Sequence, residues 1–412
     1  MNEELLAAYE ETKSLGLKLN MARGKPGSDQ LELSSEILGV LENPVAEDGT
    51  DCCNYGVLDG LPEAKRLMAI MLDDDPENVF VGGNASLTLM YDTIARFHSF
   101  GSLGSTPWCT LEAVKWICPV PGYDRHVAIT EAFGYEMIPV TMNENGPDMD
   151  EVERLAASDA SVKGIWCVPK YSNPSGITYS DETVRRLAQM ECAANDFRIV
   201  WDNAYCIHHL YDDPSQQDAV IDIAAACKEA GNPNRYVKFA STSKVTLPGA
   251  GVSAFAASPE NMDEARMRIG VQAIGHDKLN QLRHVRFLRD EKGLAAHMAK
   301  HAAILRPKFE LVLSKLEEGL GHVEGCTWTA PRGGYFISLD VPEGCARRTV
   351  ELCKDAGVVL TGAGATWPYG NDPKDSNIRI APTLPPLGEL DQAMDVLVLC
   401  VKLAAAEKGL LA

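Results

Sequence analysis

The chain has 412 residues, 23% charged and 45% hydrophobic, a composition typical of globular proteins and a length beyond one ordinary hydrophobic core. Its 58 acidic and 38 basic residues give a formal net charge of −20, which argues against nucleic acid or an anionic membrane as a partner. No apolar run reaches membrane-spanning length and residues 1–5 do not resemble a signal peptide, so we expect a cytoplasmic protein whose 12 scattered cysteines are reduced thiols.

Before residue 90, two segments with closely spaced glycines are candidates for a binding site. The first, residues 54–62, reads Asn-Tyr-Gly-Val-Leu-Asp-Gly-Leu-Pro, and the second, Gly-Gly-Asn-Ala-Ser, follows the apolar run 79–81. Small residues that open a helix leave backbone N–H groups free at the positive end of the helix dipole. The second segment therefore predicts an anion-binding turn at Asn84, Ala85 and Ser86.

The middle of the chain alternates apolar runs with helical stretches. Residues 162–168, 198–202 and 236–240 are nearly continuous apolar strands, and residues 181–194 and 218–230 are helical in pattern. Such alternation predicts a largely parallel sheet covered by helices on both faces. Ligands of these folds bind at the carboxyl ends of the strands.

Polar residues follow each of these three strands. Asn173 lies in Ser-Asn-Pro-Ser-Gly, Asp202 begins Asp-Asn-Ala-Tyr, which ends at Tyr205, and Lys244 closes Ser-Thr-Ser-Lys. A lysine that ends a buried strand between hydroxyls and glycines suits covalent attachment of pyridoxal phosphate. Asp202 can then supply the acid that this cofactor needs at its ring nitrogen, and Asn173 and Tyr205 can contact its 3′ oxygen.

Each motif also has an ordinary alternative. Asp-Asn and Asn-Pro-Ser-Gly are common in turns, and a lysine at a strand end is commonly a solvated charge. The occurrence of all three at successive strand ends favours the cofactor site. His208 and His209 are adjacent, so their side chains point to different sides, and we expect no metal site there.

Beyond residue 290 the pattern changes. Apolar residues recur at helical spacing at Leu305, Phe309, Val312, Leu316 and Leu320, and residues 333–339 and 377–381 read as strands. We therefore expect an α/β protein in which a large domain, residues 51–290, has a mostly parallel central sheet with helices on both faces. Residues 291–412 form a smaller α+β domain, which the N-terminal segment 1–50 joins.

The three motifs, in this order, resemble those of the fold-type I pyridoxal phosphate enzymes, specifically the class I aminotransferases, and the resemblance extends over nearly the whole chain. It is strongest to the branch called aspartate aminotransferase type Ic, which is related to the aminotransferase-like half of MocR regulators. The resemblance implies that Lys244 carries pyridoxal 5′-phosphate and Asp202 pairs with the ring nitrogen. It assigns Asn173 and Tyr205 to the 3′ oxygen.

The same resemblance assigns further residues. Tyr123, in Pro-Gly-Tyr, would stack on the cofactor ring, and Arg379, in Asn-Ile-Arg-Ile-Ala, would bind the substrate α-carboxylate beside Gly24 and Asn173. Tyr55 would reach the cofactor phosphate of a neighbouring subunit, which implies a homodimer with shared active sites.

One position departs from the wider family, which commonly has a phosphate-binding arginine shortly after the lysine. Gly251 stands near that position, and the next basic residue is Arg266. The type Ic branch shares the Pro-Gly-Ala-Gly run that contains this glycine. We therefore expect the phosphate to rest on neutral donors: Ser241, Ser243, the Ala85 and Ser86 amides, and the neighbour's Tyr55.

The resemblance implies a cytoplasmic transaminase that works by a ping-pong mechanism, in which Lys244 moves a proton to and from the substrate Cα. The expected amino donor is aspartate or another acidic amino acid, with 2-oxoglutarate as acceptor. A side-chain carboxylate needs a second cation, for which the candidates are Arg23, Lys25, Lys278 and Arg283. Arg332 either lines the substrate entrance or caps a strand.

Two alternatives remain, one that keeps the cofactor with another reaction and one from a different functional class. A β-lyase or decarboxylase would use the same lysine and aspartate with a different substrate orientation. An effector-binding module of a regulator would need a basic winged helix of about 60 residues before the site. We expect none, because Tyr55 follows so soon after the start of the chain.

Overall fold

The computed structural model describes residues 2–411 and contains one large sheet, whose eight strands run in the order β2-β9-β8-β7-β6-β3-β4-β5. Strands β4, β3, β6, β7 and β8 are parallel, and β5, β9 and β2 are antiparallel to their neighbours. The strands are β2 (Val79–Val81), β3 (Lys115–Val120), β4 (Glu136–Asn143), β5 (Gly146–Pro147), β6 (Val162–Cys167), β7 (Arg198–Asp202), β8 (Tyr236–Ser241) and β9 (Ser253–Ala257).

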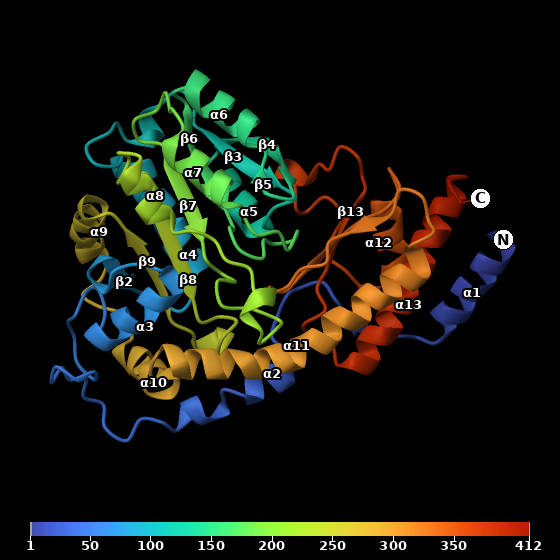
Figure 1. The fold of residues 1–412 in the computed structure, drawn as a ribbon, viewed down its shortest axis with the longest axis horizontal. Coiled ribbons are helices and arrows are strands. Elements are labelled where there is room, and N and C mark those ends of the chain that lie inside the picture. Colours follow the sequence, from blue (N-terminus) through green and yellow to red (C-terminus); the bar gives the residue numbers. More distant parts are fainter. Residues whose placement is uncertain (1, 412) are drawn as a thin grey trace.

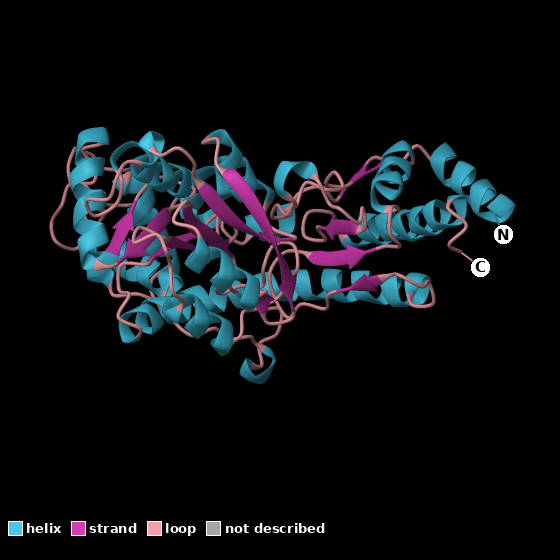
Figure 2. Cartoon of the chain, turned by 90° about the horizontal axis from the view of Figure 1, so that it is seen from above, coloured by secondary structure: helices cyan, strands magenta, loops and turns pink. Residues whose placement is uncertain are grey.

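Helices cover both faces of this sheet (Figures 1 and 2). Val200 packs among residues of α4 and α9, whereas Ile199 and Trp201 pack among residues of α6, α7 and α8. Both faces of β7 are therefore buried, which explains its continuous apolar sequence. The helices are α3 (Pro62–Leu72), α4 (Ser86–Phe100), α5 (Asp124–Ala132), α6 (Met149–Ser158), α7 (Asp181–Gln189), α8 (Ile223–Glu229), α9 (Pro259–Gln272) and α10 (Lys278–Leu288).

A second, antiparallel sheet lies beside the first in the order β10-β11-β13. The 30-residue helix α11 (Glu291–Leu320) runs along both parts of the molecule (Figure 1). The other elements here are β10 (Thr327–Trp328), β11 (Ile337–Asp340), α12 (Ala346–Asp355), β12 (Val358–Val359), β13 (Asn377–Ile380) and α13 (Leu387–Glu407).

The N-terminal residues pack against this smaller part. Helix α1 (Asn2–Ser14) contacts α13, and β1 (Leu19–Asn20) pairs with β12 in parallel. The short helix α2 (Ser28–Glu32) follows and contacts α11. The two termini therefore lie side by side (Figure 1). These features agree with the expected α/β architecture, whereas the domain boundaries at residues 50 and 290 stay a prediction.

Three predicted elements differ from the structure by more than one residue at an end. Helix α8 starts at Ile223 rather than at residue 218, because the Asp222 side chain caps it by accepting bonds from the Ala224 and Ala225 amides. Helix α7 ends at Gln189, since Met190 is extended, with ψ 145°. Strand β11 begins at Ile337, because Gly334 has φ +81° and its amide donates to the His208 carbonyl instead of to the sheet.

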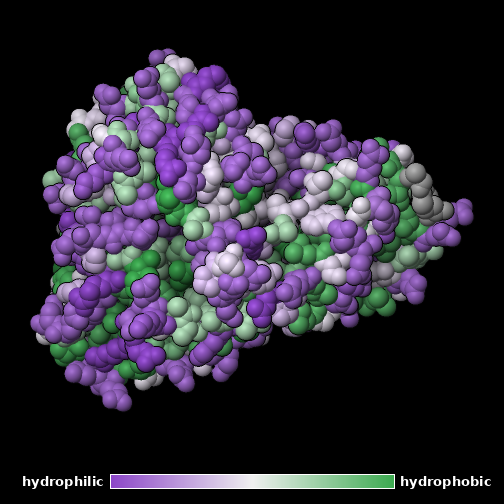
Figure 3. Space-filling view, in the orientation of Figure 1, coloured by the Kyte–Doolittle hydropathy of each residue, from purple (hydrophilic) through white to green (hydrophobic). Residues whose placement is uncertain are grey.

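The face of the molecule shown in Figure 3 is mostly hydrophilic, with hydrophobic residues gathered in separate patches. Within residues 2–411, no helix has the length and apolar character needed to cross a membrane.

Candidate active site

The carboxyl ends of three adjacent parallel strands bring the predicted cofactor residues together. Asp202 is the last residue of β7, Lys244 follows β8, and Asn173 follows β6. Asn173 and Asp202 are buried, and Lys244 is half-buried. The Lys244 Nζ lies 4.9 Å from the centre of the Tyr205 ring and 6.0 Å from that of Tyr335.

The environment of Lys244 favours its uncharged form. Burial lowers the pKa of its amine below the usual 10.5, and the carboxylate of Asp202 opposes this shift only in part. An uncharged amine can act as a nucleophile or accept a proton, so this environment prepares Lys244 for both roles.

Asp202 has one satisfied and one unsatisfied oxygen. Its Oδ2 accepts a hydrogen bond from Nε2 of His126 at 3.0 Å, and its buried Oδ1 has no partner within residues 2–411. An unpaired buried carboxylate oxygen is costly, so a donor is missing from this position. The protonated ring nitrogen of pyridoxal phosphate is such a donor, and the site therefore fits the predicted cofactor.

His126 was not predicted from the sequence. Its ring stacks on Trp166 at a centroid distance of 4.5 Å, and it meets the Tyr123 ring edge-on at 4.9 Å. Tyr123 precedes α5 and His126 lies in its first turn, so the spacing Tyr-x-x-His was the available signal.

Two phenols complete the buried part of the site. Burial raises the pKa of Tyr205 well above 10, and raises that of Tyr123 to about 12. Both therefore keep their hydroxyl hydrogen at neutral pH and can donate it. Tyr123, His126, Trp166, Ser172 and Asn173 line one cavity.

Arg379 reaches the same site from β13. Its Nη1 donates to Oδ1 of Asp124 (2.8 Å) and to Oδ1 of Asn173 (3.2 Å), and its Nη2 donates to the Thr361 hydroxyl (3.1 Å). Its buried Nε has no partner within residues 2–411. Because guanidinium has five N–H groups, Nε–H and one Nη2–H remain available to donate to a carboxylate.

Gly24 lies against Phe336, whose ring is next to this arginine. The Phe336 ring centre is 4.8 Å from the guanidinium carbon of Arg379, and a Cβ atom at position 24 would lie 2.4 Å from Phe336 Cζ. Position 24 thus has no room for a side chain. Arg23 and Lys25, which flank it, are both exposed.

The predicted phosphate cradle is formed by neutral groups. Ala85 precedes the first residue of α4, Ser86, and Ser241 Oγ donates to Ser243 Oγ at 3.0 Å. Gly251 lies against the same turn, since a Cβ atom there would be 3.0 Å from the Asn84 carbonyl oxygen.

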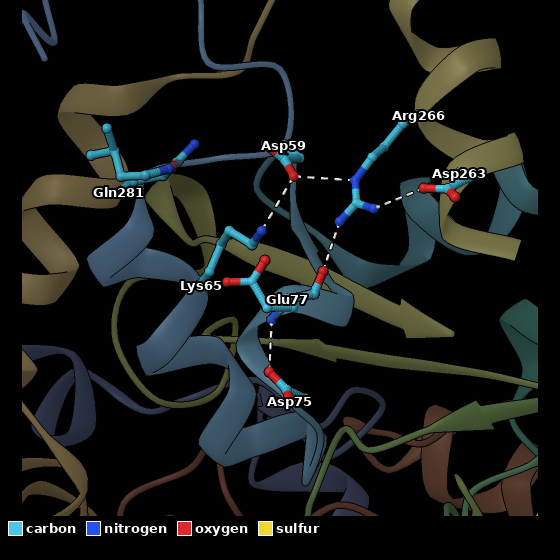
Figure 4. Close-up of polar contacts among 8 residues, drawn as sticks. Asp59, Lys65, Asp75, Glu77, Asp263, Arg266 and Gln281 are labelled. Carbon is cyan, nitrogen blue, oxygen red and sulfur yellow. Dashed lines mark hydrogen bonds and ion pairs between the residues drawn. The ribbon is translucent and has the colours of Figure 1, made fainter. Parts of the chain in front are cut away.

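Arg266 contacts Asp59, Asp263 and Glu77 (Figure 4). Its Nε pairs with Asp59 at 3.2 Å, and its Nη2 donates to the Glu77 carbonyl at 2.8 Å. Asp59 also pairs with Lys65 at 3.2 Å, so these two cations fix the loop that follows Tyr55.

Tyr55 projects into solvent, with 85% of its surface exposed. The loop that carries it is held by Lys278, whose buried ammonium donates to the carbonyls of Asn54 (2.6 Å) and Gly56 (3.0 Å). Lys278 is therefore already engaged by two carbonyl groups. Another candidate cation, Arg283, is half-buried and donates from Nη2 to Asn280 Oδ1 at 2.8 Å.

Three other sequence candidates are also placed by the structure. Arg332 is exposed, and its carbonyl accepts from the Leu210 amide. Nε2 of His208 lies 3.3 Å from the Lys244 carbonyl oxygen, whereas Nδ1 of His209 lies 2.7 Å from the Tyr171 hydroxyl. Within residues 2–411, no group of three or more His, Cys, Asp or Glu side chains is arranged to hold a metal ion.

Comparison with known proteins shows the family of this chain. The family model described as "Aspartate amino-transferase" matches residues 1–411. An aspartate aminotransferase of Corynebacterium glutamicum is 50% identical over 409 residues, which cover 98% of this chain and 94% of that protein.

Solved structures have the same fold. The crystal structure of an aspartate transaminase from Corynebacterium glutamicum is 50% identical in sequence and has a TM-score of 0.95. The match covers 99% of this chain and 96% of that one. An α-aminoadipate aminotransferase from Thermus thermophilus, complexed with N-(5′-phosphopyridoxyl)-L-leucine, is 20% identical with a TM-score of 0.75 over 95% of this chain and 93% of that one. The chain belongs to the aspartate aminotransferase family and is an aminotransferase.

Proposed function

We propose that this aminotransferase depends on pyridoxal 5′-phosphate and moves the amino group of aspartate, or another acidic amino acid, to a 2-oxo acid such as 2-oxoglutarate in a ping-pong cycle. The observation that carries the cofactor proposal is the unpaired, buried Oδ1 of Asp202. It lies in the same site as a lysine whose pKa is lowered by burial. The substrate proposal rests on the 50% identical aspartate aminotransferase of Corynebacterium glutamicum.

When bound, pyridoxal phosphate withdraws electrons from the substrate Cα through its protonated ring. Asp202 Oδ1 would hold the proton of the ring nitrogen, and His126 keeps the carboxylate in place through Oδ2. Lys244 Nζ, whose pKa is lowered by burial, would take the proton from the substrate Cα in its uncharged form and later return it.

Two donors would hold the 3′ oxygen of the cofactor. The amide oxygen of Asn173 accepts from Arg379, which leaves its Nδ2–H groups free to donate. Tyr205 keeps its hydroxyl hydrogen because its pKa is raised by burial. The remaining Nε–H and Nη2–H groups of Arg379 would bind the substrate α-carboxylate, with Gly24 and Phe336 closing that side.

The phosphate would rest on Ser241, Ser243 and the α4 N-terminus, with a donor from a second subunit. Three exposed hydrophobic residues lie near the Tyr55 loop: Met267 (59% exposed), Val271 (91%) and Ile274 (64%), and Gly275 packs directly against Gly56. Exposed apolar residues that gather in this way mark an interface. They support a homodimer in which the partner's Tyr55 contacts the phosphate.

For the second carboxylate of an acidic substrate we favour Arg23 over Lys278. Arg23 is exposed and adjacent to Gly24, whereas the Lys278 ammonium is engaged by two carbonyl groups. We also propose that the chain belongs to the type Ic, MocR-like branch, on the basis of its Pro-Gly-Ala-Gly run, and that it is cytoplasmic, on the basis of its scattered cysteines.

An assay of amino donors with 2-oxoglutarate tests this proposal. Glutamate should form fastest with aspartate, in amounts equal to the 2-oxo acid produced, and a Lys244→Ala variant should form none. Release of ammonia or carbon dioxide instead of glutamate would indicate a lyase or decarboxylase and contradict the proposal.

A further inference from the structure

Four buried histidines surround the turn that carries Lys244. His208 follows β7, His284 lies in α10, and His297 and His301 lie in α11. Burial lowers the pKa of His208 to about 3 and those of His284 and His301 to about 4, and it lowers that of His297 as well. All four are therefore neutral at physiological pH, and each presents one donor and one acceptor nitrogen.

These side chains complete a backbone turn. The amides of Val245 and Thr246 both donate to the Thr242 carbonyl at 2.9 Å, which forms a single helical turn. The carbonyl groups at the end of such a turn lack partners within it. Here the Lys244 carbonyl oxygen has the Tyr335 hydroxyl at 3.4 Å and His208 Nε2 at 3.3 Å.

The next carbonyl is held in the same way. The Val245 carbonyl oxygen lies 2.7 Å from His297 Nε2 and 3.0 Å from His301 Nε2. Each nitrogen supports this oxygen only if it carries a hydrogen. The tautomer of His301 therefore decides whether it attracts or repels the turn.

Gln30 fixes that tautomer. Its Oε1 accepts from the Gly27 amide at 3.1 Å, so its Nε2 is the group that faces His301 Nδ1 (3.0 Å) and the Tyr335 hydroxyl (2.9 Å). Because Nε2 only donates, His301 must accept at Nδ1 and carry its hydrogen on Nε2. The Tyr335 oxygen likewise accepts from Gln30, and its own hydrogen is free for the Lys244 carbonyl.

We propose that Gln30 is a positioning residue for Lys244: through His301 and Tyr335 it sets which atoms donate to the Lys244 and Val245 carbonyls. It thereby ties the lysine to the N-terminal segment 24–27, whose Gly24 packs on Phe336 beside Arg379. That segment is fixed from its other side too, because the Thr383 hydroxyl donates to the Lys25 carbonyl at 2.8 Å. The proposal rests on the role of Lys244 given under the proposed function.

Gln30→Glu tests this proposal because it keeps the shape and removes both donors. A carboxylate would draw the Tyr335 hydrogen away from the Lys244 carbonyl and compete for the hydrogen of His301. In the chain without cofactor, amide hydrogen exchange of residues 242–246 should become at least about tenfold faster than in the wild type. In the enzyme loaded with pyridoxal phosphate, kcat should fall at least about tenfold with little change in KM. The pH midpoint of its visible absorbance should also shift.

Two further variants keep the test decisive. Tyr335→Phe introduces no charge and should also speed exchange at residues 242–246, and the double variant should be no worse than Gln30→Glu alone, because both act on one path. The matched control is Asn261→Asp. Asn261 is another buried amide, in α9, and its Nδ2 donates to the Asn234 carbonyl and the Ser258 hydroxyl. It should leave the exchange of residues 242–246 unchanged.

Unchanged exchange in both Gln30→Glu and Tyr335→Phe would overturn the positioning role, and so would an equal effect of Asn261→Asp. Should Gln30→Glu not fold, Tyr335→Phe alone decides by the same criteria. A wild-type chain that takes up no pyridoxal phosphate would refute the proposed function while leaving the exchange comparison interpretable.

Discussion

Replacement of Asp202 by asparagine removes the charge at the base of the site but keeps its shape. The amide oxygen of asparagine can still accept from His126, whose Nε2 lies 3.0 Å from Asp202 Oδ2. The amide NH₂ group then faces the position of Oδ1, which is buried and unpaired in the wild type. A donor at that position cannot hold the proton of a ring nitrogen.

The loss of one hydrogen bond to a charged group costs about 1.5–3 kcal/mol. At about 1.4 kcal/mol per factor of ten, kcat should fall roughly 12- to 140-fold in Asp202→Asn. The thermal midpoint should change little, since the His126 bond is retained. Steady-state kinetics with aspartate and 2-oxoglutarate measure the effect. Turnover of a folded, cofactor-loaded Asp202→Asn enzyme within about twofold of the wild type would refute the role of Asp202.

Three other predictions concern the subunit interface, the substrate side and the lysine. Tyr55→Phe and Lys244→Ala, each inactive or nearly so, should regain activity when mixed and allowed to exchange subunits; exchange proven by mass with no recovery, together with a competent monomer in sedimentation, would exclude the shared site. Gly24→Ala would place a Cβ atom 2.4 Å from Phe336 Cζ, so it should lower the free energy of unfolding by about 1–3 kcal/mol. It should also raise KM for the amino donor, and an unchanged KM would show that Phe336 does not support Arg379. Because burial lowers the pKa of Lys244, uptake of pyridoxal phosphate by the cofactor-free chain should rise with pH and level off clearly below 10.5. Uptake that instead rises with pH as an ordinary lysine titrates, around 10.5, would contradict this prediction.

Much of the fold could be predicted because its strands are buried on both faces. The run 198–202 coincides with β7, and runs 162–168 and 236–240 differ from β6 and β8 by one residue at an end. The start of α8 could not be placed from apolar periodicity, since it depends on the capping carboxylate of Asp222.

The site residues at strand ends were predictable for a topological reason. Parallel strands place their carboxyl ends at one edge, so Asn173, Asp202 and Lys244 had to be neighbours once the strands were identified. Polar partners from other elements were not predictable in this way. His126 contacts Asp202 across 76 residues, with only the Tyr-x-x-His spacing as a local signal, and Gln30 contacts Tyr335 across 305 residues with no local signal.

The covalent role of Lys244 is the central claim, and peptide mapping tests it most directly. Borohydride reduction of the enzyme loaded with pyridoxal phosphate should leave the pyridoxyl group on Lys244. Lys238 is the internal control: it is buried in β8 only six residues earlier, but its ammonium pairs with Asp74 (2.9 Å) and Asp222 (2.7 Å). A pyridoxyl group on Lys238 or on any lysine other than Lys244 would contradict the account.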